Sequence, residues 1–201
     1  MGVRIRQATK ADRDAVLRVV DDSFRDDPVS NWIFPDPARY DRVHAQMMGA
    51  FFDLCLEHGW VDVTEDLSAV AMWLPTPEGE PEPDDGPAQL RAAVDPDNDR
   101  IETVGALTAA NHPHHREHAY LWIIGVDPQR QGEGLGSSLM VPVLERCDRE
   151  GTAAYLEASS ARSRELYLRS GFTDLGEPLR LPDGGPLMYP MWRDPQTEPR
   201  L

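Results

Sequence analysis

Apolar positions along this chain alternate with polar ones in some stretches and recur every three to four residues in others. The clearest stretch is an apolar run from Tyr120 to Val126, followed by a glycine-rich segment and by helically spaced apolar residues from Leu139 to Cys147. A short continuous apolar run predicts a strand, and a spacing of three to four predicts a helix. Residues 119–151 are therefore expected to form a strand, a glycine turn and a helix.

The same patterns predict most other elements. Helices are expected over about 12–24, 37–57 and 162–170, with a weaker helical stretch over 88–111 that breaks at Asp95 and Pro96. Strands are expected over 3–6, 60–64, 69–74, 153–157 and 187–192, and another starts at Phe172. Residues 31–35 form an aromatic-rich loop or a short helix. The sequence contains no internal repeat.

Length and composition indicate a soluble globular protein. The 201 residues are enough for one domain with a substantial core. No apolar run approaches the roughly 20 residues that cross a bilayer, and the first residues lack the apolar segment of a signal peptide. We therefore expect a cytoplasmic protein that does not bind membranes. Cys55 and Cys147 both fall in helical patterns, so we expect buried thiols rather than a disulfide framework.

The charge is strongly negative, with a formal net charge of −15. This argues against nucleic acid as a partner, because phosphate binding needs a basic surface. It favours cationic small molecules only weakly, since solubility alone also explains it. Much of the acidity lies between Glu78 and Asp85, and residues 75–87 are expected to form a mobile surface loop. Residues 195–201 are expected to form a disordered tail.

The stretch from Gln129 to Gly136 has the composition of an anion site. Glycines let backbone N–H groups approach a ligand closely, and the start of the following helix attracts a phosphate. A dinucleotide fold is one interpretation, because Glu157 ends the next strand. However, the glycine spacing is one residue short of that fingerprint and more than half of the chain precedes it. A P-loop is excluded, because no Gly-Lys-Ser/Thr follows.

A third interpretation fits the spacing better. Gln129, Gly132 and Gly134 match the Gln/Arg-x-x-Gly-x-Gly/Ala pattern of the Gcn5-related N-acetyltransferase (GNAT) family. The segment 166–172 matches that family's Tyr-x-x-x-Gly-Phe signature, about 35 residues further on and beyond an intervening strand. The chain therefore resembles this family. The segments 24–28 and 73–75 and a closing Gly-Pro-x-x-x-x-Met also resemble antibiotic acetyltransferases of the puromycin N-acetyltransferase type.

The resemblance implies a fold and an activity. The fold is α/β, with a central mixed, mostly antiparallel sheet of six to seven strands, flanking helices, and a V-shaped splay between the fourth and fifth strands. The strand that carries residues 123–126 is expected to end in a bulge at this splay. Residues 1–194 would form a single N-acetyltransferase domain, with 75–118 as a variable acidic and helical insert. The implied reaction transfers an acetyl group from acetyl-CoA to a primary amine of a small molecule by direct attack, and the protein would be a monomer or a homodimer. A non-catalytic acyl-CoA-binding or sensing domain, and an acetyltransferase acting on protein or peptide amines, are the alternatives.

The resemblance also implies which residues contact coenzyme A. They are Ile124, Gly125, Val126, Gln129, Arg130, Gln131, Gly132, Glu133, Gly134, Leu135, Gly136, Ser137, Ser138, Ser160, Ser163 and Tyr167. Alternatively, Arg130 is only a solvated surface charge. Ser137 and Ser138 are alternatively ordinary residues of a helix start. Ser160 stands where many relatives carry an asparagine, so contact with the CoA arm is expected to be weaker there.

The chemistry requires two proton transfers. Tyr167 occupies the family's general-acid position, and its phenol keeps a proton at neutral pH that it can give to the departing sulfur. Glu157 and His118 are the candidate bases. Alternatively, Tyr167 only packs along the CoA pocket, and Glu157 is a structural carboxylate that holds a loop. The histidines between His112 and His118 lack the helical spacing of a metal site, so no metal is expected.

The acceptor amine is expected near the N-terminal helices. The candidate residues are Asp27, Trp32, Phe34 and Tyr120, with Asp26 and Tyr40 nearby. An aromatic wall with carboxylates suits a cationic or aromatic amine. Alternatively, Trp32 and Phe34 attach their segment to the core.

Overall fold

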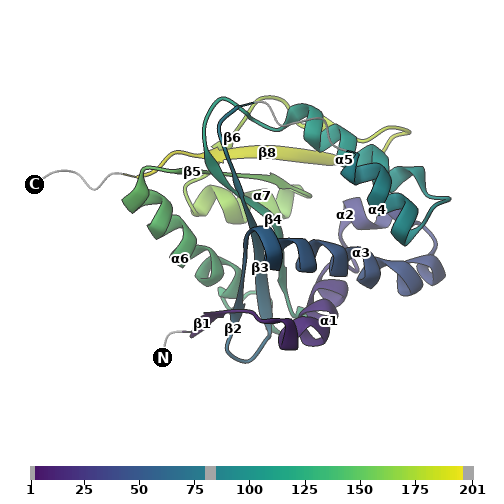
Figure 1. Ribbon diagram of the computed structural model, residues 1–201, viewed down its shortest axis with the longest axis horizontal. Helices are drawn as coiled ribbons and strands as arrows, with labels where there is room; N and C mark the ends of the chain where they lie inside the picture. The colour runs from purple at the N-terminus through teal and green to yellow at the C-terminus, as the bar shows by residue number, and fades with distance from the viewer. Residues whose placement is uncertain (1–2, 80–84, 197–201) are drawn as a thin grey trace, which may run out of the picture.

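The computed structural model describes residues 3–79 and 85–196, and its centre is a mixed sheet of eight strands (Figure 1). The strand order is β1-β2-β3-β4-β5-β8-β6, with β7 paired to β8, and β4–β5 is the parallel pair among otherwise antiparallel neighbours. The strands are β1 (Ile5–Gln7), β2 (Trp60–Thr64), β3 (Ala69–Thr76), β4 (His118–Val126), β5 (Ala153–Ala158), β6 (Thr173–Asp174), β7 (Leu179–Arg180) and β8 (Leu187–Arg193). The α/β class and the mixed sheet are confirmed.

The α-helices of the described residues are α1 (Arg13–Ser23), α2 (Pro28–Ile33), α3 (Pro37–His58), α4 (Gly86–Val94), α5 (Asp99–Asn111), α6 (Leu135–Glu150) and α7 (Ala161–Arg169). Local sequence explains several of their ends. The side chains of Asp27 and Asp36 cap α2 and α3, each followed by proline at the first helical position. Gly151, at a φ of 73°, ends α6. None of the helices in these ranges is long and apolar enough to cross a membrane.

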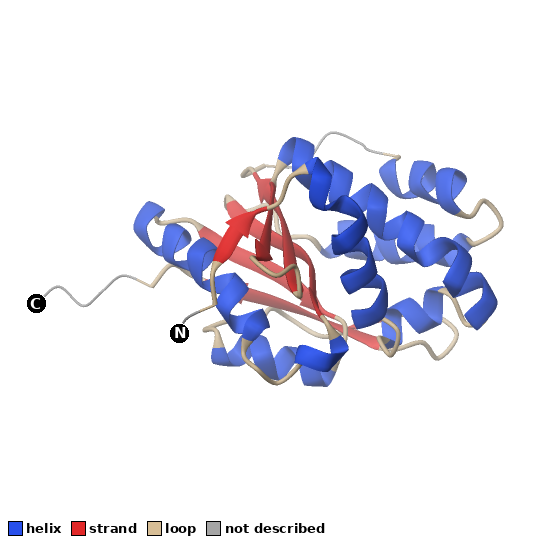
Figure 2. Cartoon of the chain, turned by 90° about the horizontal axis from the view of Figure 1, so that it is seen from below, coloured by secondary structure: helices blue, strands red, loops and turns tan. Residues whose placement is uncertain are grey.

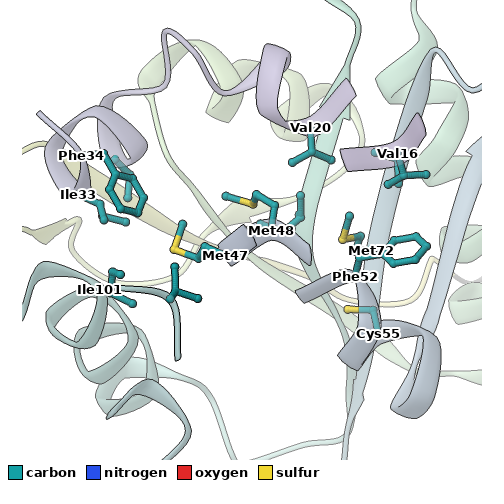
Figure 3. Close-up of a cluster of buried hydrophobic side chains, with 14 of the residues drawn as sticks. Val16, Val20, Ile33, Phe34, Met47, Met48, Phe52, Cys55, Met72 and Ile101 are labelled. Carbon is teal, nitrogen blue, oxygen red and sulfur yellow. The ribbon is translucent and has the colours of Figure 1, made fainter. Parts of the chain in front are cut away.

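The helices form layers on the two faces of the sheet. Helices α1 and α3 pack on one face and α6 on the other, with α7 against β5 and β8. Beyond α3, helices α2, α4 and α5 gather at one end of the molecule, as Figures 1 and 2 show. The core under α1 and α3 joins these parts, since Val16 of α1, Phe52 of α3 and Ile101 of α5 all belong to it (Figure 3).

The predicted splay between β4 and β5 is present. The two strands pair only from His118 to Tyr120 against Ala153 to Tyr155, and beyond that point they separate. The bulge expected at the end of β4 lies instead in its middle. The pairing with β3 skips one residue there, so that Trp122 and Ile123 both face the core under α3, whereas Leu121 and Ile124 face α6.

Most predicted elements are confirmed, with shifts of a few residues at their ends. Residues 88–111 form two helices separated near Asp95, as predicted, and the aromatic segment 31–35 includes the end of α2. The two-residue strand β7 has too little pattern to be predicted. Cys55 and Cys147 are buried free thiols, as expected.

The predicted loop and tail are only partly covered by the described residues. Residues 80–84 and 197–201 lie outside them. On either side of 80–84, β3 continues to Thr76 and α4 begins at Gly86, and the N–H of Gly79 donates to the carbonyl of His114 at 2.9 Å. In the tail, the N–H of Gln196 donates to Asp148 of α6 at 2.6 Å, and the predicted disorder of residues 195–201 stays a prediction.

Candidate active site

A cavity of about 1450 Å³ lies where β4 and β5 separate. The glycine loop, the start of α6 and α7 form one end of its wall, and α3, α4 and α5 form the other. Tyr120 to Val126 of β4 and Glu157 of β5 line it between these ends. The cavity therefore connects the predicted phosphate loop with the predicted acceptor side.

The glycine loop has the geometry of an anion site. Gly132 and Gly134 have φ values of 86° and 81°, which glycine adopts without strain. A side chain built at either position would meet no atom within 4 Å, so this face of the loop is open. Gly134 begins α6, and the first N–H groups of that helix have no intrahelical acceptor. The loop can therefore offer several backbone donors and a helix dipole to a phosphate.

Most residues predicted to contact CoA line this cavity. They are Ile124, Gly125, Val126, Gln131, Gly132, Gly134, Leu135, Gly136, Ser137, Ser160, Ser163 and Tyr167. Gln129, Arg130, Glu133 and Ser138 lie outside the lining. Arg130 pairs with Glu133 at 2.7 Å and with Asp66 at 2.9 Å, so its charge is already compensated.

Ser160 and Ser163 form the cap of α7. Ser160 Oγ accepts from the Ser163 N–H at 3.1 Å, and the Ser160 N–H donates to Ser163 Oγ at 3.2 Å. Both hydroxyls are thus engaged in starting the helix, although their residues line the cavity. This agrees with the weak ligand contact expected at Ser160.

Glu157 and Tyr155 lie on the same face of β5, and Glu157 lies just beyond the part of β5 that pairs with β4. The hydroxyl of Tyr120 donates to Glu157 Oε2 at 2.8 Å, and that of Tyr155 donates to Oε1 at 3.0 Å. These two hydrogen bonds favour the ionised form and lower the pKa of Glu157, but burial outweighs them and raises this pKa to about 7. A carboxyl group with such a pKa is suited to accept a proton near neutral pH.

Tyr167 projects from α7 and is 6% exposed. Its ring packs edge-on against Phe172, with centroids 6.1 Å apart. Burial, and then the negative charge of Asp27, raise the pKa of the phenol above its ordinary value. The phenol therefore keeps its proton throughout the neutral range.

Asp27, a predicted acceptor residue, lies near Tyr167. It lines the cavity, its Oδ1 accepts from the N–H groups of Val29 and Ser30 at 2.9 Å each, and its Oδ2 accepts from the Ser159 hydroxyl. Burial raises the pKa of its carboxyl group. Asp27 therefore joins the start of α2 to the end of β5.

Two predicted acceptor residues, Trp32 and Phe34, do not line the cavity. Phe34 is 1% exposed and contacts the ring of Tyr40 edge-on at 6.2 Å. The guanidinium of Arg100 covers the ring of Trp32 at 4.7 Å. These contacts fit the alternative in which both aromatic residues attach their segment to the core.

His118, one of the two candidate bases, does not line the cavity either. It is 1% exposed, its Nδ1 lies 2.9 Å from the carbonyl of Arg116, and the rings of Tyr155 and Trp192 cover it. Pairing with β5 closes this part of β4, so His118 cannot reach the cavity. Two other histidines, His112 and His114, line the cavity, and His112 Nε2 lies 3.0 Å from His118 Nε2.

The acceptor end has a largely apolar wall that was not predicted. Helix α5 lines it with one face, at Ile101, Val104, Gly105, Thr108 and Ala109, and His112 follows directly after the helix. Opposite them, Phe51 of α3 packs on Trp122 of β4 with ring centroids 4.3 Å apart. The helical spacing of Ile101, Val104 and Thr108 was the available signal, but it does not say what the face covers.

The splay between β4 and β5, the open glycine loop, Glu157 and Tyr167 all border one cavity. The chain belongs to the Acetyltransferase (GNAT) family, whose model matches residues 54–172.

Relatives of known name and structure agree with this. Over its whole length the chain resembles the crystal structure of histone acetyltransferase HPA2 and related acetyltransferase from Corynebacterium glutamicum, with a TM-score of 0.70, 26% identity and 100% of both chains covered. It shares the fold of yncA from Salmonella typhimurium, whose structure contains its cofactor acetyl-CoA (TM-score 0.58, 18% identity, 100% and 98% covered). In sequence it is 39% identical over 66 residues to L-2,4-diaminobutyric acid acetyltransferase of Marinococcus halophilus, a match covering 32% of this chain and 37% of that protein. The matched segments thus span about a fifth to just over a third of the curated relatives.

Proposed function

We propose that the chain transfers the acetyl group of acetyl-CoA to a primary amine of a small molecule. The observation that carries this is one cavity that connects an open phosphate loop with Glu157 and Tyr167 at the splay. Acetyl-CoA supplies an activated acetyl thioester, and its presence in the related Salmonella structure supports it as the donor.

The chain offers binding groups along the whole length of such a donor. The N–H groups at the start of α6 and the glycine loop would hold the pyrophosphate. The edge of β4 beyond Tyr120 is left unpaired by β5, so its backbone groups would pair with the amides of the pantetheine arm. A backbone N–H near Val126 would then polarise the thioester carbonyl.

Two side chains would move the protons. Glu157 would take one from the attacking amine, directly or through water, since its pKa of about 7 matches that task. Tyr167 would give one to the departing sulfur. A thiolate leaves readily even without this proton, so the acid accelerates the reaction but is not indispensable.

We infer direct attack without an acyl-enzyme. Cys55 and Cys147 are 0% and 2% exposed and lie outside the cavity lining. Burial raises the pKa of Cys55 to about 12 and raises that of Cys147, so neither supplies a thiolate nucleophile.

The acceptor end favours an amine carried on an apolar body. Its wall includes Met47, Phe51, Trp122, Ile101 and Val104, with carboxylates near the centre of the cavity. An aryl or branched alkyl group would bury apolar surface there, at about 25 cal/mol per Å² removed from water, while the ammonium faces Glu157. A short diamine would leave its second charge against apolar side chains.

Two alternatives remain distinguishable. A sensing domain would bind acyl-CoA without turnover. A peptide acceptor would need an open groove, whereas α4 and α5 cover the acceptor end of this cavity.

An assay of CoA release with a panel of amines tests the proposal. We expect turnover with 2-phenylethylamine above that with 1,4-diaminobutane, and strongly reduced turnover in Glu157→Gln. Tight acetyl-CoA binding with no turnover on any amine would support the sensing alternative.

A further inference from the structure

His112 closes the acceptor end of the cavity. It follows the last residue of α5, and Glu157 lines the same cavity. Its ring meets the rings of Tyr120 and Tyr155 edge-on, with centroids 4.8 Å and 4.9 Å away. The hydroxyls of these same two tyrosines bind Glu157, so one tyrosine side chain separates His112 from the carboxylate.

The hydrogen bonds of the two histidines fix where their protons are. A backbone carbonyl only accepts, so His118 Nδ1, 2.9 Å from the Arg116 carbonyl, carries a proton. In a neutral imidazole the other nitrogen then has a lone pair. The proton between the two Nε2 atoms, 3.0 Å apart, therefore belongs to His112. Burial supports the neutral state, because it lowers the pKa of His112 to about 4 and lowers that of His118.

This assignment leaves His112 Nδ1 as an unprotonated acceptor. No described residue donates a hydrogen bond to it. Protein atoms do not fully enclose Nδ1, since it is absent from the buried side-chain nitrogens that lack a partner. His112 also lines the cavity. An acceptor of fixed orientation thus lines the cavity that also holds Glu157, with a tyrosine side chain between the two groups.

We propose that His112 Nδ1 accepts a hydrogen bond from the acceptor amine and, with Glu157, orients it for attack. This inference rests on the proposed function. A neutral primary amine that attacks the thioester carries two N–H groups: one gives its proton to Glu157, and the other stays on the nitrogen as the N–H of the product amide. The N–H that stays becomes more acidic as the nitrogen gains positive charge, so a hydrogen bond from it to a neutral imidazole strengthens in the transition state. His118 is a positioning residue, which holds His112 in the required tautomer.

Two substitutions separate the two nitrogens of His112. In His112→Asn the amide oxygen stands near the place of Nδ1 and keeps an acceptor toward the cavity, but the contact with His118 is lost. In His112→Gln the amide nitrogen reaches the place of Nε2 and keeps the donor to His118, but the acceptor is lost. His115→Gln is the matched control, because this exposed histidine lies outside the cavity lining.

We expect His112→Gln to lower kcat/KM for the amine about 10- to 100-fold, the effect of one hydrogen bond to a group that becomes charged. Its KM for acetyl-CoA and its melting temperature should stay near those of the unaltered protein. His112→Asn should retain more of kcat/KM despite a lower melting temperature, and His115→Gln should be unchanged. The opposite ranking, with His112→Gln fully active and His112→Asn impaired, would show that the histidine pair is only structural and overturn the inference.

The tautomer gives a readout that needs no substrate. In ¹⁵N spectra of the protein at neutral pH, His112 should appear as the neutral form protonated at Nε2. A proton on Nδ1 would overturn the inference whatever the activity. Absence of turnover in the unaltered protein on every amine would instead count against the proposed function.

Discussion

Replacing Tyr155 with phenylalanine tests the role of Glu157 as the base. The substitution removes the hydroxyl that donates to Glu157 Oε1 at 3.0 Å and leaves the ring in place. This hydrogen bond favours the ionised carboxylate. Its loss should therefore raise the pKa of Glu157 above its present value of about 7.

The structure sets the size of the shift. A hydrogen bond to a charged group contributes about 1.5–3 kcal/mol, and one pKa unit corresponds to about 1.4 kcal/mol, so the upper range is about two units. Tyr120 still donates to Oε2 at 2.8 Å, and water in the cavity replaces part of the lost bond, so we expect about one unit. The ionised fraction of Glu157 at neutral pH then falls from about a half to about a tenth, which lowers kcat/KM about fivefold.

The assay is kcat/KM for one amine, measured from CoA release across the neutral and alkaline range. Because the same amine is used for both proteins, its own titration cancels in the comparison. The acid limb of the variant should lie about one unit higher, and the two rates should converge at alkaline pH. Tyr40→Phe removes a buried hydroxyl that donates to the carbonyl of Asp21 at 3.0 Å, and should leave the limb in place. An unmoved limb in Tyr155→Phe would refute the assignment of Glu157.

Other expectations follow from the same structure. Tyr167→Phe should lower kcat about 10- to 100-fold with an unchanged Kd for acetyl-CoA by calorimetry, and unchanged turnover would remove Tyr167 as the acid. Gly134→Ala forces a left-handed φ of 81° on alanine, which costs about 1–2 kcal/mol. This variant should bind acetyl-CoA more weakly. Gly151→Ala, at a φ of 73° at the other end of α6, should lose stability but keep its affinity for acetyl-CoA. The raised pKa of Glu157 means that the folded protein binds this proton more tightly than the unfolded chain, so stability should fall as pH rises from about 4.5 to about 7. Glu157→Gln should make that fall smaller in thermal melts across this range, since Asp62 and Asp27, whose pKa values burial also raises, still contribute to it. An identical pH dependence would contradict the shift.

The elements of the fold were largely predictable because they depend on local periodicity. The helix over 37–58 and the strand β4 each carry a long apolar pattern. The bulge in β4 was misplaced for a physical reason. It depends on how β3 pairs across the strand, and Trp122 carries no local signal for an extra residue.

The site divides in the same way. Its donor end was predictable, since the glycine loop and Tyr167 belong to short motifs of fixed spacing. Its acceptor end was not, because it is assembled from separate segments. His118 and Tyr120 do share a face of β4, but the rings of Tyr155 and Trp192 enclose the first, whereas the second lies at the last pair with β5 and lines the cavity. His112 reaches the cavity only because α5 ends there.

The puromycin-type subgroup, the extent of the domain and the oligomeric state stay predictions. The acceptor class depends on the wall formed by α3 and α5, which sequence patterns do not assign to a ligand. Exchanging apolar for acidic residues on that wall, as in Val104→Glu, should therefore shift preference from arylalkylamines toward diamines.

Mass spectrometry of the acceptor after incubation with acetyl-CoA and the purified protein tests amine acetylation most directly. We predict that 2-phenylethylamine gains one acetyl group on its nitrogen, at a rate that Glu157→Gln greatly reduces. Bound acetyl-CoA with no acetylated amine from any member of the panel would contradict it.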